Sequence, residues 1–344
     1  MFKIENHFGG ETTYFVGDLC INGCQCFTLA EAPEVFDDFD VPEAMRDDVY
    51  RNLPQPDWSL GDVDAAVCSD VAGHAATPPA LLALLARGND RSVWSAVAGN
   101  PNTPAEALLL LAPCMWVSVR WAVAHNRSTP PEALALLARS EDYIVRLEVV
   151  RNPNAPAEAL LLLARDVRHY VRCETAGNAK TPPEALLALA SDESDETRYC
   201  VASHPNTPVG ALALLAQDVK CTVRRAVAGR QATPPADLML LAQDVDWTVC
   251  RAVAGNQAAG PATLALLVRH VDWSVRRAVA GNQATPPEVL ALLAQDGEVS
   301  VRLEVSGHQN TPPATLALLA QDVDWSVRRV AAGRQAKPPA GVGL

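Results

Sequence analysis

The sequence predicts an all-helical solenoid built from a two-helix repeat of 26 residues. Three observations predict it. A Thr-Pro-Pro-Glu marker, or a near variant, returns at a constant interval; a leucine-rich run follows each marker; and a second apolar run usually ends in Gly. A unit of this length cannot bury its own apolar faces, so stability has to come from stacking neighbouring units on one another.

The marker sets the register of the whole array. Every interval is 26 residues, and ten units fit between residues 77 and 336 without insertion or deletion. A partial unit precedes them at about residues 62–76. The marker begins at Thr77, Thr103, Thr129, Ala155, Thr181, Thr207, Thr233, Ala259, Thr285, Thr311 and Lys337.

The first run of each unit has the signals of a helix start. Thr is a favourable N-cap, Pro is tolerated at the first helical position, and Glu three residues after Thr completes a capping box. Leucines at three slots, for example Leu134, Leu136 and Leu137, point around most of this helix. A helix that is apolar nearly all round is expected to be buried on several sides.

The second run predicts a shorter helix with one apolar face. Val245, Val249, Ala252 and Val253 have the spacing of such a face. Gly255 follows where a left-handed residue would end the helix. The run is about two turns long, which is short enough for a 3₁₀ stretch.

The repeat motifs closely resemble those of the leucine-rich repeat variant family. The pattern TPPEALxxLA occurs at Thr129–Ala138 and Thr181–Ala190, and DxxxxVR and AVAGN follow it, for example at Asp322–Arg328 and Ala278–Asn282. The resemblance covers about residues 62–336. It implies a right-handed superhelix of alternating α and 3₁₀ helices without the sheet of ordinary leucine-rich repeats. HEAT-like repeats are the nearest alternative, but their units are usually longer and less uniform.

Two charged slots recur along the repeats. We expect Asp to cap the second helix, and Arg to pair with it or with the Asp of an adjacent unit. The alternative is an arginine row that binds an acidic partner or phosphate, although the Asp row would neutralise it. The arginines are Arg120, Arg146, Arg172, Arg198, Arg224, Arg276, Arg302 and Arg328, and the aspartates are Asp166, Asp192, Asp218, Asp244, Asp296 and Asp322.

Trp247, Trp273 and Trp325 share another slot, which Tyr143 also occupies. These rings either pad the edge between helices or form an aromatic strip on a binding face, where Trp is common. The candidate partner surface therefore comprises the three tryptophans with Arg224, Arg276, Arg302 and Arg328. A row of Asn after the Gly slot is explained by loop hydrogen bonds. It comprises Asn100, Asn126, Asn152, Asn178, Asn256 and Asn282, and His74, His204 and His308 replace it elsewhere.

Cys20, Cys24 and Cys26 lie within seven residues of one another. Thiolates at this density suit a soft metal or an iron–sulfur cluster, which commonly takes four cysteines. Cys68, at the junction with the first unit, is the natural fourth ligand. Some members of the resembled family hold a four-iron, four-sulfur (4Fe-4S) cluster in an N-terminal domain, so the resemblance implies one here. The spacing C-x3-C-x-C departs from ferredoxin patterns, and zinc or no metal are the alternatives.

The charge distribution separates the N-terminal segment from the repeats. The net charge is −12, of which residues 1–60 contribute −9 and the remaining residues −3. We expect a small acidic domain or cap at residues 1–61, the solenoid at 62–336, and a frayed tail at 337–344. In the first part, Phe2–Phe8 and Thr12–Val16 flank Gly9-Gly10 as a hairpin, and Asp40 opens a short helix through Asn52.

These features favour a non-enzymatic scaffold for protein–protein interaction, because the sequence contains no recognisable catalytic or nucleotide-binding motif. The main alternative is a redox protein whose solenoid docks a partner near a cluster. Nucleic-acid binding through the arginine row is a weaker alternative, because the repeats are not basic. An odd number of unevenly spaced cysteines fits a reducing cytoplasm, and neither a secretory signal nor a transmembrane run is expected.

Overall fold

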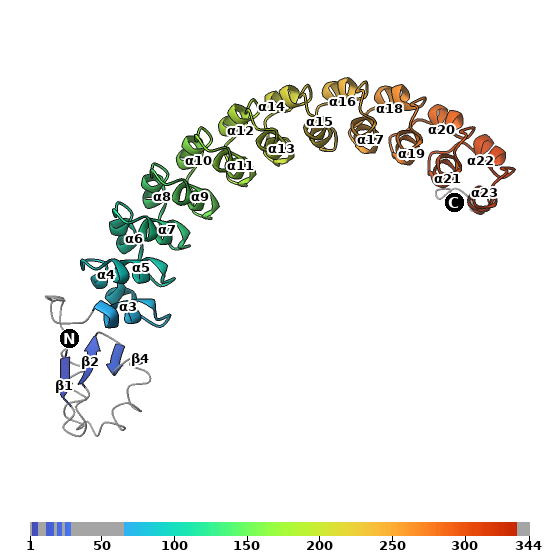
Figure 1. The fold of residues 1–344 in the computed structure, drawn as a ribbon. Coiled ribbons are helices and arrows are strands. Elements are labelled where there is room, and N and C mark those ends of the chain that lie inside the picture. The colour runs from blue at the N-terminus through green and yellow to red at the C-terminus, as the bar shows by residue number, and fades with distance from the viewer. Residues whose placement is uncertain (1, 6–11, 17–18, 23–24, 29–64, 336–344) are drawn as a thin grey trace, which may run out of the picture. The chain divides into compact units, whose positions relative to one another are not determined.

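The computed structural model describes residues 2–5, 12–16, 19–22, 25–28 and 65–335 (Figure 1). The chain divides into two compact units, Met1–Lys180 and Thr181–Leu344. The predicted boundary between residues 61 and 62, the helix from Asp40 to Asn52 and the tail at 337–344 lie outside the described residues.

Unit 1 contains a small sheet and a stack of alternating nine- and seven-residue helices. The strands are β1 (Phe2–Glu5), β2 (Thr12–Val16), β3 (Leu19–Asn22) and β4 (Gln25–Thr28). The helices are α3 (Ala65–Gly73), α4 (Pro79–Leu85), α5 (Arg91–Gly99), α6 (Ala105–Leu111), α7 (Val117–His125), α8 (Pro131–Leu137), α9 (Tyr143–Arg151), α10 (Ala157–Leu163) and α11 (His169–Gly177).

Unit 2 has the same alternation, except that α15 has eight residues and α23 has eleven. Its helices are α12 (Pro183–Leu189), α13 (Asp195–Ser203), α14 (Val209–Leu215), α15 (Cys221–Ala228), α16 (Pro235–Leu241), α17 (Trp247–Gly255), α18 (Pro261–Leu267), α19 (Trp273–Gly281), α20 (Pro287–Leu293), α21 (Val299–Gly307), α22 (Pro313–Leu319) and α23 (Trp325–Gln335). The predicted solenoid of two-helix repeats is therefore confirmed, and the second helix of each repeat is α rather than 3₁₀.

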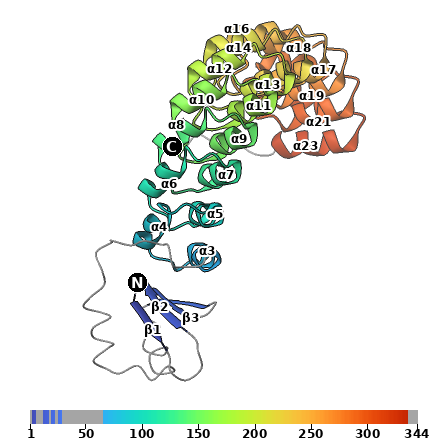
Figure 2. The ribbon, with the colours of Figure 1, turned by 60° about the vertical axis from the view of Figure 1, so that its left-hand side comes forward.

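The two kinds of helix pack differently. Successive odd-numbered helices from α13 to α23 pack directly on one another, whereas the even-numbered helices make few contacts with their own kind. Within unit 2 the odd-numbered helices accordingly lie on the inner side of the stack, as Figures 1 and 2 show. In both units we call the odd-numbered helices the inner helices and the even-numbered helices the outer helices.

The core lies between the two rows. In α8, Leu134 and Leu137 are fully buried, but Leu136 is 54% exposed. The expectation that the outer helix is covered nearly all round is therefore wrong, because widely spaced outer helices leave one leucine of the three uncovered. The inner helices bury Val249 and Val253, whereas Val245 precedes α17 and is exposed, so its predicted place on the helix face is also wrong.

The marker threonine has a different role from the one predicted. Pro130 is the N-cap of α8 without any side-chain cap bond, and Pro131 occupies the first helical position. The Thr129 hydroxyl instead donates to the carbonyl of Val123, at 2.5 Å, near the end of the preceding helix. Thr285 repeats this bond to Val279 at 2.6 Å. The threonine thus ties each inner helix to the outer helix that follows it, and the predicted capping box is wrong.

The glycine that closes most inner helices does not adopt a left-handed conformation. Gly255 and Gly281 are the last residues of α17 and α19, and neither has a positive φ between +20° and +160°. The C-cap is the extended residue that follows, Asn256 or Asn282. Glycine in this slot therefore leaves a bare stretch of helix surface instead of reversing the chain.

The described part of the N-terminal segment forms an antiparallel sheet in the order β1-β2-β3-β4. The predicted pairing of the first two strands is confirmed, with Phe2 opposite Phe15 and Glu5 opposite Thr12. Residues 6–11, which hold the end of the predicted first strand and the Gly9-Gly10 turn, lie outside the described residues. Strands β3 and β4 were not predicted.

Candidate functional site

An arginine–aspartate ladder joins successive inner helices. In unit 2, Arg276 of α19 binds Asp296 with Nε–Oδ2 2.6 Å and Nη2–Oδ1 2.9 Å. The Asp lies 20 residues after the Arg, at the start of the next inner segment. The same two-pronged pair occurs for Arg146–Asp166 in unit 1, and for Arg198–Asp218, Arg224–Asp244 and Arg302–Asp322 in unit 2. Pairing with the Asp of an adjacent repeat is therefore confirmed.

This aspartate is not the cap of the inner helix. Asp296 Oδ1 accepts the backbone N–H of Glu298, two residues on, in an Asx-type turn. The cap is a second residue two positions later: Asp272 accepts from Ser274 N in α19, and Asp246 accepts from Thr248 N in α17. The predicted capping role therefore belongs to a neighbouring slot.

Hydrogen bonding and charge dominate the electrostatics of the ladder. The hydrogen bond from Arg302 holds the pKa of Asp322 below its usual range. Burial acts to raise the pKa of Asp296, but hydrogen bonds from Arg276 and from the Glu298 amide outweigh it, and the pKa is lowered. These aspartates are therefore ionised partners in the pairs.

A second ladder runs through the row of Asn side chains. Asn282 Nδ2 donates to the carbonyls of Ala254 and Asn256 in the preceding repeat, both at 2.8 Å, and its Oδ1 accepts from Ala284 N at 2.9 Å. His308 fills the slot in the next repeat by donating from Nε2 to the Asn282 carbonyl at 2.9 Å. The row therefore connects repeats as well as closing loops.

The arginine–aspartate pair is missing from several repeats. Neither partner is present at Cys68 and Gly88 or at Trp94 and Cys114 in unit 1, or at Cys250 and His270 in unit 2, and Arg120 is followed at the aspartate position by Ser140. Cys250 is buried, and burial raises the pKa of its thiol. A protonated, buried thiol is a poor nucleophile, so Cys250 serves packing.

The arginines predicted for partner binding are therefore mostly engaged within the solenoid. The side chain of Arg276 is only 17% exposed, and Arg224 and Arg302 are similarly covered. Arg328 differs, since it is exposed and contacts the carbonyls of Asp322 and Val323.

The predicted aromatic strip lies on the accessible surface of unit 2. Trp247, Trp273 and Trp325 are 42%, 44% and 61% exposed. Each is the first residue of an inner helix, namely α17, α19 and α23. The rings are thus available to contact another molecule.

A second arginine column, which was not predicted from the sequence, lies one helical turn after the tryptophans. It comprises the exposed residues Arg225, Arg251, Arg277 and Arg329. The Arg329 guanidinium lies 4.9 Å from the centre of the Trp325 ring, within cation–π range. Paired arginines in the sequence, such as Arg276-Arg277, were the available signal. We call the tryptophans and these four arginines the basic-aromatic face.

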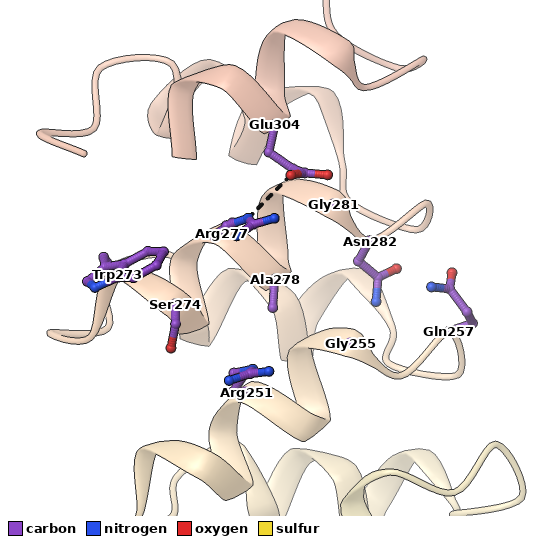
Figure 3. A pocket seen from close by; sticks show the side chains of 10 residues that line it. All are labelled: Arg251, Gly255, Gln257, Trp273, Ser274, Arg277, Ala278, Gly281, Asn282 and Glu304. Carbon is purple, nitrogen blue, oxygen red and sulfur yellow. Dashed lines mark hydrogen bonds and ion pairs between the residues drawn. The ribbon is translucent and has the colours of Figure 1, made fainter. Parts of the chain in front are cut away.

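A cavity of about 390 Å³ opens on this face between α17, α19 and α21 (Figure 3). Trp273, Arg277, Arg251, Gln257, Asn282 and Glu304 line it, with Gly255 and Gly281 exposing the helix backbone. Arg277 Nε lies 3.4 Å from Glu304 Oε2. Arg251 forms no side-chain hydrogen bond or ion pair within the described residues, so its donors face the cavity unpaired.

A second cavity, of about 450 Å³, lies in unit 1 beside the Trp94–Cys114 substitution. Leu110, Leu111 and Met115 give it an apolar lining. The Trp94 indole N–H is buried there without a hydrogen-bond partner. Arg87 and Cys114 also line this cavity.

The predicted cluster ligands are only partly described. The backbone register places Cys20 opposite Phe27 and Cys26 opposite Ile21, so the two are not direct cross-strand partners. Cys24 lies outside the described residues. Cys68 lies in α3 and is buried in the core of unit 1. Within the described residues, no three or more His, Cys, Asp or Glu side chains come together as a metal site.

None of the helices described between Ala65 and Gln335 has both the length and the apolar character needed to cross a membrane. The model of the leucine rich repeat variant family matches residues 144–167 and 273–298. A comparison with curated proteins gave no significant match.

Among solved structures, one described as "a leucine-rich repeat variant with a novel repetitive protein structural motif" is 29% identical, with a TM-score of 0.50. The match covers 65% of this chain and 88% of that one. An engineered protein is 17% identical over 79% of this chain and 95% of its own, with a TM-score of 0.33. Importin beta is 12% identical over 88% of this chain and 48% of its own, with a TM-score of 0.34.

Proposed function

The repeats of this chain belong to the leucine-rich repeat variant family, and from that premise we propose that the chain is a non-catalytic scaffold that binds another protein through the basic-aromatic face. The observation that carries the proposal is that the two arginine columns, one containing Arg276 and the other Arg277, have different roles. One column holds the repeats together, and the other projects from the surface beside exposed tryptophans.

The composition of the face is that of a protein-binding site. Trp and Arg are enriched among residues that dominate binding energy, especially around pockets that exclude water. Trp273, Arg277 and Arg251 line an open cavity on this face. The core of the repeat is already filled by residues such as Val275 and Val279, so packing alone does not account for large exposed side chains at these slots.

A capture experiment with matched variants tests this proposal. Immobilised full-length chain is compared with Trp247→Ala/Trp273→Ala and with a control, Leu266→Ala/Leu292→Ala, whose leucines are also exposed but lie on outer helices. We expect a protein captured by wild type and by the control to be lost with the tryptophan variant, while all three unfold at similar temperatures. Equal capture by the tryptophan variant would contradict the proposal.

The iron–sulfur cluster at Cys20, Cys24, Cys26 and Cys68 stands as a separate proposal. Its support is the density of cysteines in the sequence and the placement of Cys20 and Cys26 on paired strands. A bound cluster would supply either one-electron chemistry or a covalent brace for the N-terminal segment. Nucleic-acid binding through the predicted arginine row has little support, because Arg224, Arg276 and Arg302 are bound to aspartates.

A further inference from the structure

The exposed arginines form a regular array. Arg225, Arg251 and Arg277 occupy the same slot in α15, α17 and α19, which pack on one another in sequence. Packed helices lie about 8–10 Å apart, so one arginine recurs at about that spacing. Trp247 and Trp273 form a parallel column one turn earlier in the same helices.

An extended segment with polyproline II geometry matches this spacing. Such a helix has three residues per turn and rises about 3.1 Å per residue, so every third side chain returns to the same edge after about 9 Å. A chain with a carboxylate at every third position would therefore meet one arginine per repeat. A second edge of the same segment would run along the tryptophan column, and aromatic grooves are the usual docking sites for proline-containing extended segments.

The N-terminal part of this chain carries such a sequence. Residues 31–42 read as four triplets, Glu-Ala-Pro, Glu-Val-Phe, Asp-Asp-Phe and Asp-Val-Pro. An acid begins every triplet and Pro or Phe ends it. These twelve residues hold five acidic side chains and no basic one. They lie outside the described residues.

We propose that residues 31–42 of a second copy of this chain bind the basic-aromatic face of unit 2. The carboxylates of Glu31, Glu34, Asp37 and Asp40 follow the arginine column, and the Pro and Phe side chains follow the tryptophan column. The inference rests on the proposed function, because it names the occupant of the same surface.

The face already shows how a carboxylate is held there. Glu304 reaches Arg277 at 3.4 Å across the cavity, and Gly281 makes room for it, since a Cβ at that position would lie 3.1 Å from Glu304 Oε1. Arg225 and Arg251 have no such partner within residues 65–335. The array therefore offers unfilled donors to an incoming acidic segment.

Every copy carries both the segment and the face, so two copies can exchange segments and close a symmetric dimer. Each exposed ion pair contributes little by itself. Two docked segments in one closed assembly act cooperatively, because the second docks at the high effective concentration that the first creates.

Sedimentation equilibrium of the full chain over a concentration series tests the inference. We expect a monomer–dimer equilibrium that weakens as salt rises. Arg225→Glu/Arg251→Glu/Arg277→Glu, and separately Glu31→Lys/Glu34→Lys/Asp37→Lys/Asp40→Lys, should weaken the dimer on the order of 10- to 100-fold. Combining both sets of substitutions in one chain should restore it. A chain that stays monomeric, or a dimer unaffected by either reversal, would overturn the inference.

The spacing itself has a composition-matched control. Glu34→Val/Val35→Glu/Asp40→Val/Val41→Asp keeps the charge and composition of the segment but breaks its triplets, and we expect it to weaken the dimer about as much as charge reversal does. An unchanged dimer would overturn the triplet register. Preferential binding of single-stranded RNA over a synthetic peptide of residues 29–44 would overturn the choice of occupant. The proposed function, binding of another protein through the basic-aromatic face, is contradicted by a different result: equal capture of that protein by wild type and by Trp247→Ala/Trp273→Ala.

Discussion

Arg276 and Arg277 are consecutive in the chain and have opposite roles. Arg276 is nearly covered and grips Asp296 of the next repeat through two hydrogen bonds. Arg277 is 53% exposed and lines the cavity of the basic-aromatic face. Successive side chains on a helix point about 100° apart, so one of these arginines joins the repeats while the other is presented to a partner.

The ladder pairs are expected to contribute measurably to stability. Asp296→Ala leaves the Arg276 guanidinium without its carboxylate and should lower the free energy of unfolding by roughly 1.5–3 kcal/mol. Urea denaturation followed by circular dichroism measures it. Glu288→Ala, on the exposed surface of α20, is the control and should change stability by less than about 0.5 kcal/mol. Equal effects of the two substitutions would contradict the structural role of the pair.

The bonds of Asn282 predict that two substitutions at this position will differ in stability. Asn282→Ala removes the side-chain donor to the carbonyl of Ala254 and one of two donors to the carbonyl of Asn256, which keeps the Ala259 N–H, at a cost of roughly 1–3 kcal/mol. Asn282→His should be better tolerated, because His308 makes the equivalent inter-repeat bond in the next repeat. Thermal unfolding of both variants checks the order, and a histidine variant no more stable than the alanine variant would refute it.

Acid should weaken the solenoid over a defined range. The pKa values of Asp218, Asp244, Asp296 and Asp322 are lowered in the folded chain. A carboxyl whose pKa is lowered by folding stabilises the fold above its unfolded pKa, about 3.9, and this contribution disappears as pH falls through the folded pKa. The unfolding free energy should therefore decline below about pH 4.

The control is Asp296→Asn/Asp322→Asn, which removes two of these titrating groups. Its stability should be lower at pH 7 and should decline less on acidification than that of the wild type. A decline as steep as that of the wild type would assign the acid sensitivity to other carboxyls.

The repeat length and helix content could be predicted because they depend on periodic local signals. A 26-residue interval, prolines at helix starts and apolar spacing all act within one unit. The Arg–Asp pairing was also predictable, since Arg276 and Asp296 recur together in register. Side-chain exposure was harder to predict from the sequence. Leu136 is exposed because the outer helices are widely spaced, and that spacing is not encoded in any single repeat.

The candidate site was predicted in part. The tryptophan column was identified, but Arg276 was assigned to the surface instead of Arg277. Choosing between adjacent arginines requires the rotation of the helix about its axis, and a fixed 20-residue distance to Asp was the clue in the sequence. The Thr129 hydroxyl was assigned to its own helix, because Thr is usually a cap, whereas it bonds the preceding helix.

The cluster proposal makes its own prediction. Protein purified without oxygen and reconstituted with iron and sulfide should bind about four of each per chain, with broad visible absorption. Cys20→Ser should lower the iron content, whereas Cys173→Ser, a repeat cysteine, should not. Colourless, iron-free wild-type protein after reconstitution would contradict the proposal.

The most direct test of the division between the two arginine columns compares Arg276→Gln with Arg277→Gln. Unfolding free energy and binding of the captured protein are measured for both. We predict that Arg276→Gln destabilises the fold by roughly 1.5–3 kcal/mol and leaves the binding of folded protein unchanged, while Arg277→Gln leaves stability within about 0.5 kcal/mol and weakens binding. The reverse pattern, or equal effects of both variants on both quantities, would contradict it.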